Sequence, residues 1–172
     1  APEFVLKEQY ENYEEAISAH ASKGARVLVF GTAKEEPDGK PLKEAVTPLA
    51  YVLLANPIRQ EAKETFTYFA EQGVEVKVIS GDNPLTVSEV AKEAGIAGAE
   101  RYVDASTLHT EEEMRAAVLN NAVFGRVTPN QKRKFVQILK EEGKTVAMTG
   151  DGVNDVLALK DADCSIAMAS GS

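Results

Sequence analysis

Thr149–Asp155, with the sequence Thr-Gly-Asp-Gly-Val-Asn-Asp, directly follows an apolar segment, 145–148, that is predicted to be a strand. Asp151 lies at the tip of this strand, and Asp155 follows in the first turn of the helix predicted next. These two carboxylates and the amide of Asn154 suit a hard divalent cation such as Mg²⁺, which proteins hold through one or two carboxylates with waters and phosphate oxygens. An acidic helix start explains one acid but not the whole pattern. The stretch therefore predicts a Mg²⁺ site with Asp151 and Asp155 as ligands.

Short apolar segments alternate with amphipathic helices on either side of this stretch. Helix starts are marked by Asn83 before Pro84 and by two capping boxes, which begin at Thr110 and Thr128. Strands are predicted at 74–79, near 102, at 123–124, at 145–148 and at 165–168. Repeated strand–helix units of this length predict an α/β fold with a parallel sheet and helices on both faces.

The first third of the chain has a different pattern. It predicts a helix over 9–21, strands at 26–30 and 49–55, and a charged loop over 34–43. The regular alternation begins at Asn56, so we expect a domain boundary there, with one domain over 1–55 and another over 56–172.

Composition narrows the class of protein. The formal net charge of −8 argues against a nucleic-acid partner, which would need a basic face, but it does not exclude a nucleotide. Cys164, the one cysteine, lies in an apolar run and is expected to be a small buried residue. The longest apolar run, Leu49–Ala55, is of strand length and far too short to cross a bilayer. Because the chain opens on Ala1 without a Met, we expect a soluble part of something larger.

Two further polar groups follow predicted strands. Ser80 offers a hydroxyl beside the free N–H groups of Gly81 and Asp82, which could cradle an anion or simply form a turn capped by Asn83. Lys132 lies in the first turn of its helix, where a ligand phosphate would offset the unfavourable helix dipole, although a solvated lysine is the simpler interpretation of that residue alone. Since ligands bind beyond the carboxyl ends of parallel strands, a hydroxyl, a lysine and paired carboxylates at one edge together predict a phosphoryl-transfer site.

Five segments, in order along the chain, resemble motifs of the P-type cation-transporting ATPases, members of the haloacid dehalogenase-like superfamily. Residues 149–155 are similar to the hinge motif of that family, and Ser80-Gly81-Asp82 to its Thr-Gly-Asp segment with Ser in place of Thr. The other three are Asn56-Pro57-Ile58-Arg59, similar to Asp-Pro-Pro-Arg with two departures, Arg126-Val127-Thr128-Pro129 followed by Lys132, and Ala1-Pro2-Glu3, similar to the end of Lys-Gly-Ala-Pro-Glu. The resemblance implies a haloacid dehalogenase-like Rossmannoid sheet after a small α/β remnant of the nucleotide-binding domain.

The resemblance also implies roles for individual residues. Asp151 would bind Mg²⁺ with support from Asp155, while Ser80, Lys132 and Asn154 would hold the transferred phosphoryl group. The residues expected along ATP are Arg26, Arg59, Gly81, Asp82 and Arg126. In that family an aspartate in Asp-Lys-Thr-Gly-Thr takes the γ-phosphoryl group of ATP, and hydrolysis of the aspartyl phosphate drives cation transport.

The sequence departs from the family pattern in one decisive respect, because it contains no Asp-Lys-Thr-Gly-Thr. We therefore expect the fragment to supply Mg²⁺-binding and phosphate-binding residues of a pump but not the nucleophile, and to be inactive alone. Two alternatives remain: a stand-alone haloacid dehalogenase-like phosphohydrolase, which would need its own nucleophilic aspartate, and a non-catalytic nucleotide-binding or partner-binding module.

Several expectations about the parent protein follow from the resemblance. The partners would be ATP, the actuator and transmembrane domains of the pump, and a cation carried by the missing membrane domain. The site would face the cytoplasm at the cell membrane, and the motif around Arg126 is more similar to the Ca²⁺/Mg²⁺-type bacterial pumps than to the copper or zinc group. Loss of the nucleophile strand would leave an open sheet edge, so dimerisation of the fragment is a further hypothesis.

Overall fold

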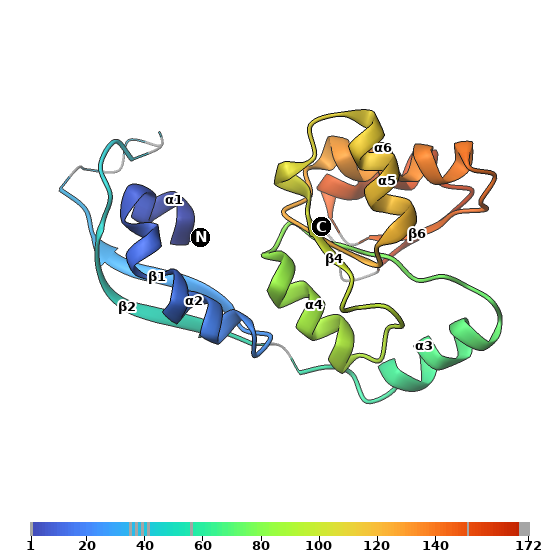
Figure 1. Cartoon of the computed structure of the whole chain (residues 1–172), viewed down its shortest axis with the longest axis horizontal. Helices are drawn as coiled ribbons and strands as arrows, with labels where there is room; N and C mark the ends of the chain where they lie inside the picture. Colours follow the sequence, from blue (N-terminus) through green and yellow to red (C-terminus); the bar gives the residue numbers. More distant parts are fainter. Residues whose placement is uncertain are drawn as a thin grey trace.

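The computed structural model describes residues 2–34, 36, 38, 40, 42–55, 57–150 and 152–168, which form two units (Figure 1). The domain boundary expected at Asn56 lies outside the described residues. In chain order the helices and strands are α1 (Pro2–Leu6), η1 (Lys7–Asn12), α2 (Glu14–Ala21), β1 (Arg26–Thr32), β2 (Thr47–Leu54), α3 (Ala62–Glu71), β3 (Val78–Ile79), α4 (Pro84–Glu93), β4 (Tyr102–Asp104), η2 (Ala105–Thr107), α5 (Glu111–Asn120), β5 (Val123–Gly125), α6 (Pro129–Glu141), β6 (Ala147–Gly150), η3 (Val153–Asp155), α7 (Val156–Asp161) and β7 (Cys164–Ala167).

The N-terminal unit, formed by the described residues up to 55, is a two-stranded antiparallel ribbon with short helices on one face. β1 pairs with β2 from Arg26 opposite Leu54 to Thr32 opposite Thr47, with an irregularity between Phe30 and Gly31. Its core packs apolar side chains of α1 and α2 against the ribbon; the buried members are Leu6, Ile17, Val27 and Val46. The expected helix over 9–21 is shorter than predicted, because residues 7–12 form a 3₁₀ helix instead.

The C-terminal unit, formed by the described residues from 57 to 168, is built on a parallel sheet of order β3–β5–β4. Successive side chains of a strand point to opposite faces, and β5 shows the consequence. Val123 belongs to the core that contains α4, whereas Phe124 belongs to the core formed with α5 and α6. Both side chains are fully buried, so helices cover the sheet on both faces as the sequence predicts.

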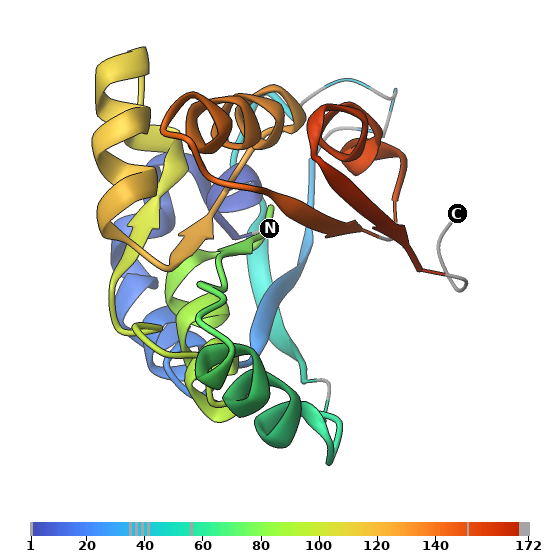
Figure 2. The same ribbon diagram turned by 90° about the vertical axis from the view of Figure 1, so that its right-hand side faces the viewer.

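β6 and β7 form a second parallel pair, and the structure shows no hydrogen-bonded ladder between β6 and β3 in the described residues. Figure 2 shows this pair beside α7, next to the C-terminal end of the chain. The sheet expected to be continuous is therefore divided into two parts. Both strands of the pair have largely exposed side chains, and Cys164 is exposed, so its predicted burial is wrong. The apolar run around Cys164 suggested burial. It lies on the β6–β7 pair, which few other elements of the described chain cover.

The local signals for helix starts are confirmed. Asn83 accepts a hydrogen bond from the Leu85 amide, and complete capping boxes are present at Thr110 and Thr128. The strand predicted over 74–79 is reduced to β3, because only its last two residues pair with β5. No helix within the described ranges has both the length and the apolar character needed to cross a bilayer.

Candidate nucleotide and phosphate site

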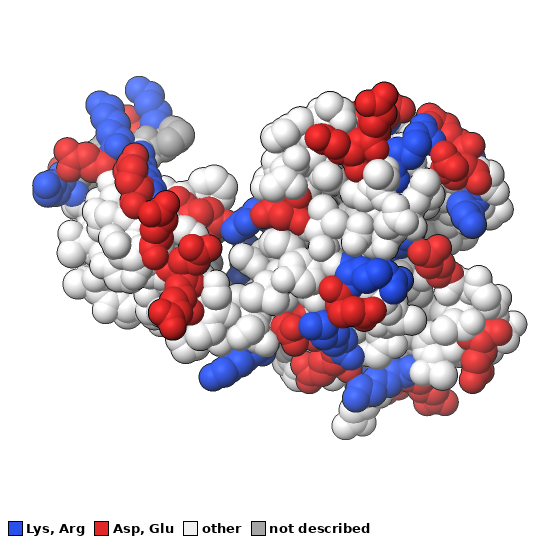
Figure 3. Space-filling model, in the orientation of Figure 1, with Lys and Arg blue, Asp and Glu red and all other residues white. Residues whose placement is uncertain are grey.

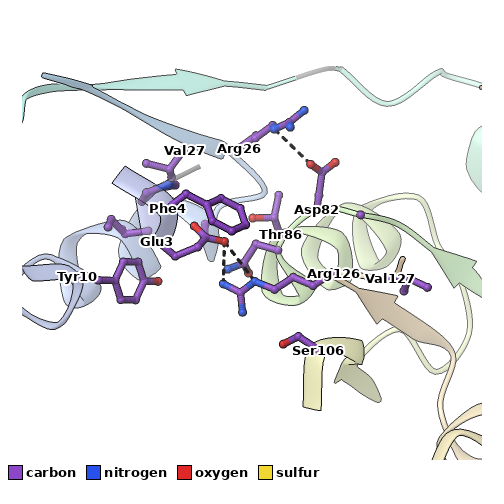
Figure 4. A pocket seen from close by; sticks show the side chains of 15 residues that line it. Glu3, Phe4, Tyr10, Arg26, Val27, Asp82, Thr86, Ser106, Arg126 and Val127 are labelled. Carbon is purple, nitrogen blue, oxygen red and sulfur yellow. Dashed lines mark hydrogen bonds and ion pairs between the residues drawn. The ribbon is translucent and has the colours of Figure 1, made fainter. Parts of the chain in front are cut away.

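A cavity of about 480 Å³ lies between the two units. Its walls come from α1 and the start of β1 on one side and from the loops after β3 and β5 on the other (Figure 4). Four of the five residues expected along ATP line this cavity: Arg26, Gly81, Asp82 and Arg126. The structure thus brings together side chains separated by up to 100 positions in the sequence.

The loops after β3 and β5 are held together by their backbones. The Arg126 amide donates to the Asp82 carbonyl at 2.8 Å, and the Val127 amide donates to the Ser80 carbonyl at 3.0 Å. Between them, Gly125 leaves no room for a side chain, because a Cβ there would lie 2.3 Å from the Pro84 Cα. This contact fixes the start of α4 against the end of β5 and so sets the floor of the cavity.

Ser80 hydrogen-bonds within its own loop. Its hydroxyl accepts from the Asp82 amide at 3.1 Å and lies 3.4 Å from the Asp82 carboxylate. Gly81 is exposed, and a Cβ at this position would meet only the Val127 carbonyl, at 3.9 Å. The loop therefore has the geometry of a turn, which was the alternative to an anion cradle at Ser80. The exposed backbone beside Gly81 still faces the cavity.

Each of the two cavity arginines is paired with a carboxylate of the other unit (Figure 4). Arg26 lies 3.2 Å from Asp82, and Arg126 lies 3.3 Å from Glu3. Arg126 also donates to Asp104 at 2.5 Å. Burial lowers the pKa of the Arg126 guanidinium, but pairing with Asp104 and Glu3 outweighs it and raises the pKa overall. Sequence analysis missed Glu3 and Asp104 as site residues.

The wider surface is acidic, so binding of an anion would depend on these local cations. Figure 3 shows acidic side chains in a row over the N-terminal unit. The exposed acidic residues of η1 and of the start of α2 are Glu8, Glu11, Glu14 and Glu15. A polyanion approaching that face is repelled, and among the described residues Arg26 and Arg126 are the cations that line the cavity.

Lys132 and Asp155 form a second, separate polar group. The Lys132 ammonium donates to the Asp155 carboxylate at 2.7 Å, and the two side chains are only 13% and 10% exposed. α6 supplies the lysine and η3 the carboxylate, and these elements pack together. Lys132 is therefore a largely buried ion-pair partner, 13% exposed, and not the solvated lysine of the simpler interpretation.

The end of β6 is shaped to accommodate this carboxylate. A Cβ at Gly150 would lie 2.8 Å from the Asp155 carboxylate, so a larger residue would displace it. Asp155 thus lies against Gly150 at the end of β6, and its buried carboxylate is chemically suited to Mg²⁺. Asp151 itself lies outside the described residues, within which no group of three or more acidic, His or Cys side chains could hold a metal ion.

Two predicted residues are placed elsewhere. Arg59 is exposed in the loop before α3 and is absent from the described lining of the cavity. Asn154 is exposed in η3, next to the buried Asp155. The roles proposed for both remain predictions.

The chain is similar to known proteins over nearly its whole length. A family model for haloacid dehalogenase-like hydrolases matches residues 2–163. The chain is 47% identical to a probable cation-transporting ATPase, exp7, of Streptococcus pneumoniae, over 99% of the chain and 22% of that protein. It is also 47% identical to the calcium-transporting ATPase CtpE of Mycolicibacterium smegmatis, over 100% of the chain and 22% of that protein.

A solved structure supports the same assignment. The catalytic domain of the CPx-ATPase CopB-B, studied for conformational changes upon nucleotide binding, matches with a TM-score of 0.53 and 25% identity, over 76% of the chain and 41% of that structure. The chain spans about a fifth of the length of the curated relatives it matches. The chain belongs to the haloacid dehalogenase-like hydrolase family, and its relatives there are cation-transporting ATPases of the P-type.

Proposed function

We propose that the chain is the cytoplasmic catalytic portion of an ATP-driven cation pump that forms and hydrolyses an aspartyl phosphate. The observation that carries the proposal is the cavity between the two units, where Arg26, Gly81, Asp82 and Arg126 meet. Guanidinium groups and exposed loop amides are the groups that bind phosphate oxygens. Relatives named cation-transporting ATPases over nearly the whole chain support the same conclusion.

In this proposal the cavity residues and the Lys132–Asp155 group bind different parts of ATP. Arg26 and Arg126 orient the phosphate tail in the cavity. Lys132, Ser80 and Asn154 hold the transferred phosphoryl group, and Lys132 offsets the negative charge that spreads over its oxygens. Asp151 and Asp155 would hold Mg²⁺, which supplies further charge neutralisation at the phosphates when bound. Asp155 also fixes the Lys132 ammonium, since the two groups lie 2.7 Å apart.

We propose that the nucleophile belongs to a strand outside this chain that lies between β3 and β6. β3 pairs only with β5 and β6 only with β7 among the described residues, so each has one edge without a ladder. Both sheets are parallel, and one further parallel strand would join them. Exposed apolar side chains near β6 fit the same hypothesis; they are Val153, Val156, Leu157, Ile166 and Met168.

The proposal extends to the parent protein. The two units would be the end of a nucleotide-binding domain, over 1–55, and a phosphorylation domain, over 56–172, on the cytoplasmic face of a cell membrane. We propose Ca²⁺ as the transported cation, because relatives of Mycolicibacterium smegmatis and of Oryza sativa are named calcium-transporting ATPases. Ca²⁺-dependent ATP hydrolysis by the complete pump, absent with Cu⁺ or Zn²⁺, is the expected result, and activation by Cu⁺ or Zn²⁺ alone would contradict it.

Nucleotide titration tests the site. We expect the chain to bind Mg²⁺–ATP weakly, with a dissociation constant above about 1 µM, which corresponds to less than about 8 kcal/mol of binding free energy. Arg126→Ala should weaken binding about tenfold or more, because a charge-assisted hydrogen bond contributes about 1.5–3 kcal/mol. NMR titration of the ¹⁵N-labelled chain measures both constants.

Arg133→Ala is the matched control, since Arg133 of α6 pairs with Asp161 of α7 and is not among the residues lining the cavity. This variant loses the same charge and should bind ATP as the unchanged chain does. Sub-micromolar affinity, or equal weakening by both variants, would contradict the proposed site.

A further inference from the structure

Arg126 is held by two carboxylates that differ in origin. Asp104 ends β4, the strand next to β5, and Arg126 directly follows β5. Glu3 comes from α1 of the other unit and contacts both Nε and Nη2 of Arg126, at 3.3 Å each. Both acids are partly buried beside the guanidinium, which is itself 28% exposed. Arg126 therefore has one partner within its own unit and one across the cavity.

The backbone of Arg126 is fixed, so only its side chain can respond to a ligand. Its φ of 52° lies in the left-handed region, which a non-glycine residue adopts only where its surroundings enforce it. The amide bond to the Asp82 carbonyl and the close contact of Gly125 with Pro84 supply that enforcement. The guanidinium thus extends from a rigid base toward the cavity.

Several hydrogen bonds hold the Asp104 carboxylate in place. Its carboxylate accepts hydrogen bonds from the amide of Ser106 at 3.0 Å and from the Ser106 hydroxyl at 2.6 Å, besides the bond from Arg126. Burial raises the pKa of Asp104, but these hydrogen bonds and the guanidinium outweigh it and lower the pKa below its ordinary value. The Nη1 side of Arg126 is therefore anchored.

Glu3 lacks comparable support, because Arg126 is the only hydrogen-bond or ion-pair partner shown for its carboxylate among the described residues. Its helix, α1, is five residues long and contributes Pro2 and Phe4 to the cavity wall. Figure 4 shows the Glu3 carboxylate pointing at the Nε and Nη2 edge of the guanidinium. That edge presents two parallel donors, the arrangement that binds a phosphate in a bidentate manner.

We propose that Asp104 is a positioning residue for Arg126, and that Glu3 occupies the place a nucleotide phosphate takes on the same guanidinium edge. Binding of ATP exchanges the Glu3 carboxylate for a phosphate oxygen pair, while Asp104 stays bound to Nη1. This inference rests on the proposed function, because it assumes that the cavity binds ATP. It predicts that removing the charge of Glu3 strengthens ATP binding and that removing the charge of Asp104 weakens it.

Opposite substitutions test the exchange. Glu3→Gln removes the competing charge and should tighten ATP binding about three- to tenfold, the size expected for one nearby like charge in a partly exposed site. Asp104→Asn frees the side chain of Arg126 and should weaken binding by about the same factor. NMR titrations of the ¹⁵N-labelled chain with Mg²⁺–ATP give the constants, and the Nε–H signal of Arg126 reports on the guanidinium directly.

Matched controls separate charge from position. Glu8→Gln removes one exposed acid of the same unit, and Asp161→Asn breaks the pair between Asp161 of α7 and Arg133 of α6, in which the aspartate is 22% exposed against 25% for Asp104. Neither should change the ATP constant. In the unchanged chain ATP should move the Arg126 Nε–H signal, and in free Glu3→Gln that signal should already be displaced.

The outcomes are distinguishable. Weaker or unchanged ATP binding in Glu3→Gln would overturn the exchange, and unchanged binding in Asp104→Asn would overturn the positioning role. If ATP moves no signal of the unchanged chain even at saturating concentrations, the proposed nucleotide site itself is wrong.

Discussion

The pair formed by Lys132 and Asp155 shows how a single contact gives a residue its role. In sequence, Lys132 is one member of the basic run Lys132–Lys134 and is indistinguishable from a solvated residue. In the structure it is buried against Asp155, whereas Lys134 pairs with Glu111 at a more exposed position. A lysine in this setting is held in place by a carboxylate before any phosphate arrives. The charge pattern along α6 cannot reveal this difference, because Asp155 comes from another element.

Lys132→Met should lower the free energy of unfolding by about 1–3 kcal/mol, because it leaves a buried carboxylate without its charged partner. Urea unfolding followed by circular dichroism measures the change. Lys134→Met is the control two positions along the same helix, and it should change stability little because exposed ion pairs contribute little. Equal losses in the two variants would show that Lys132 is not specially buried.

At the scale of elements, the open edges of β3 and β6 have a consequence for the isolated chain. Unpaired strand edges are templates for pairing with another chain. We therefore expect the chain to dimerise as its concentration rises, as measured by light scattering. Ala147→Lys places a charge on the exposed face of β6 and should suppress the association.

Ala116→Lys makes the same substitution on the exposed face of α5, away from both edges, and should leave the association unchanged. A monomer at every concentration would count against the hypothesis. So would equal effects of the two lysines.

Helices were predictable from sequence at this scale, whereas the pairing of strands was not. The caps at Asn83, Thr110 and Thr128 are confirmed because their signals lie within three residues of the helix start. The extent of β3 depends on its neighbour β5, which lies more than 40 residues away, so an apolar run alone overestimates its length. Cys164 was misjudged for the same reason, since burial depends on what covers a strand.

The residues of the candidate site were likewise only partly predictable from the sequence. The resemblance to P-type ATPase motifs implied Arg26, Asp82 and Arg126 as nucleotide-binding residues, and the cavity brings them together. Glu3 and Asp104 carried no such signal, because their link to Arg126 spans 123 and 22 positions and appears only in the folded chain. The resemblance included Glu3 only as part of Ala1-Pro2-Glu3, with no role at the site.

At the scale of the whole molecule, the account describes half of a catalytic site. We propose that the cavity between the units and the Lys132–Asp155 pair bind phosphate, but no segment in the sequence matches the Asp-Lys-Thr-Gly-Thr that carries the nucleophile in the family it resembles. A stand-alone phosphohydrolase would supply its own aspartate and would turn over p-nitrophenyl phosphate. The presence or absence of a nucleophile in this chain therefore distinguishes a pump fragment from a stand-alone phosphohydrolase.

Phosphorylation of the chain and of its complete parent protein, side by side with Mg²⁺ and γ-³²P-labelled ATP, tests this division most directly. The account predicts an acid-stable, hydroxylamine-sensitive label on the complete protein and none on the 172-residue chain, with no turnover of p-nitrophenyl phosphate by the chain. A labelled chain, or a complete protein that takes no label, would contradict it.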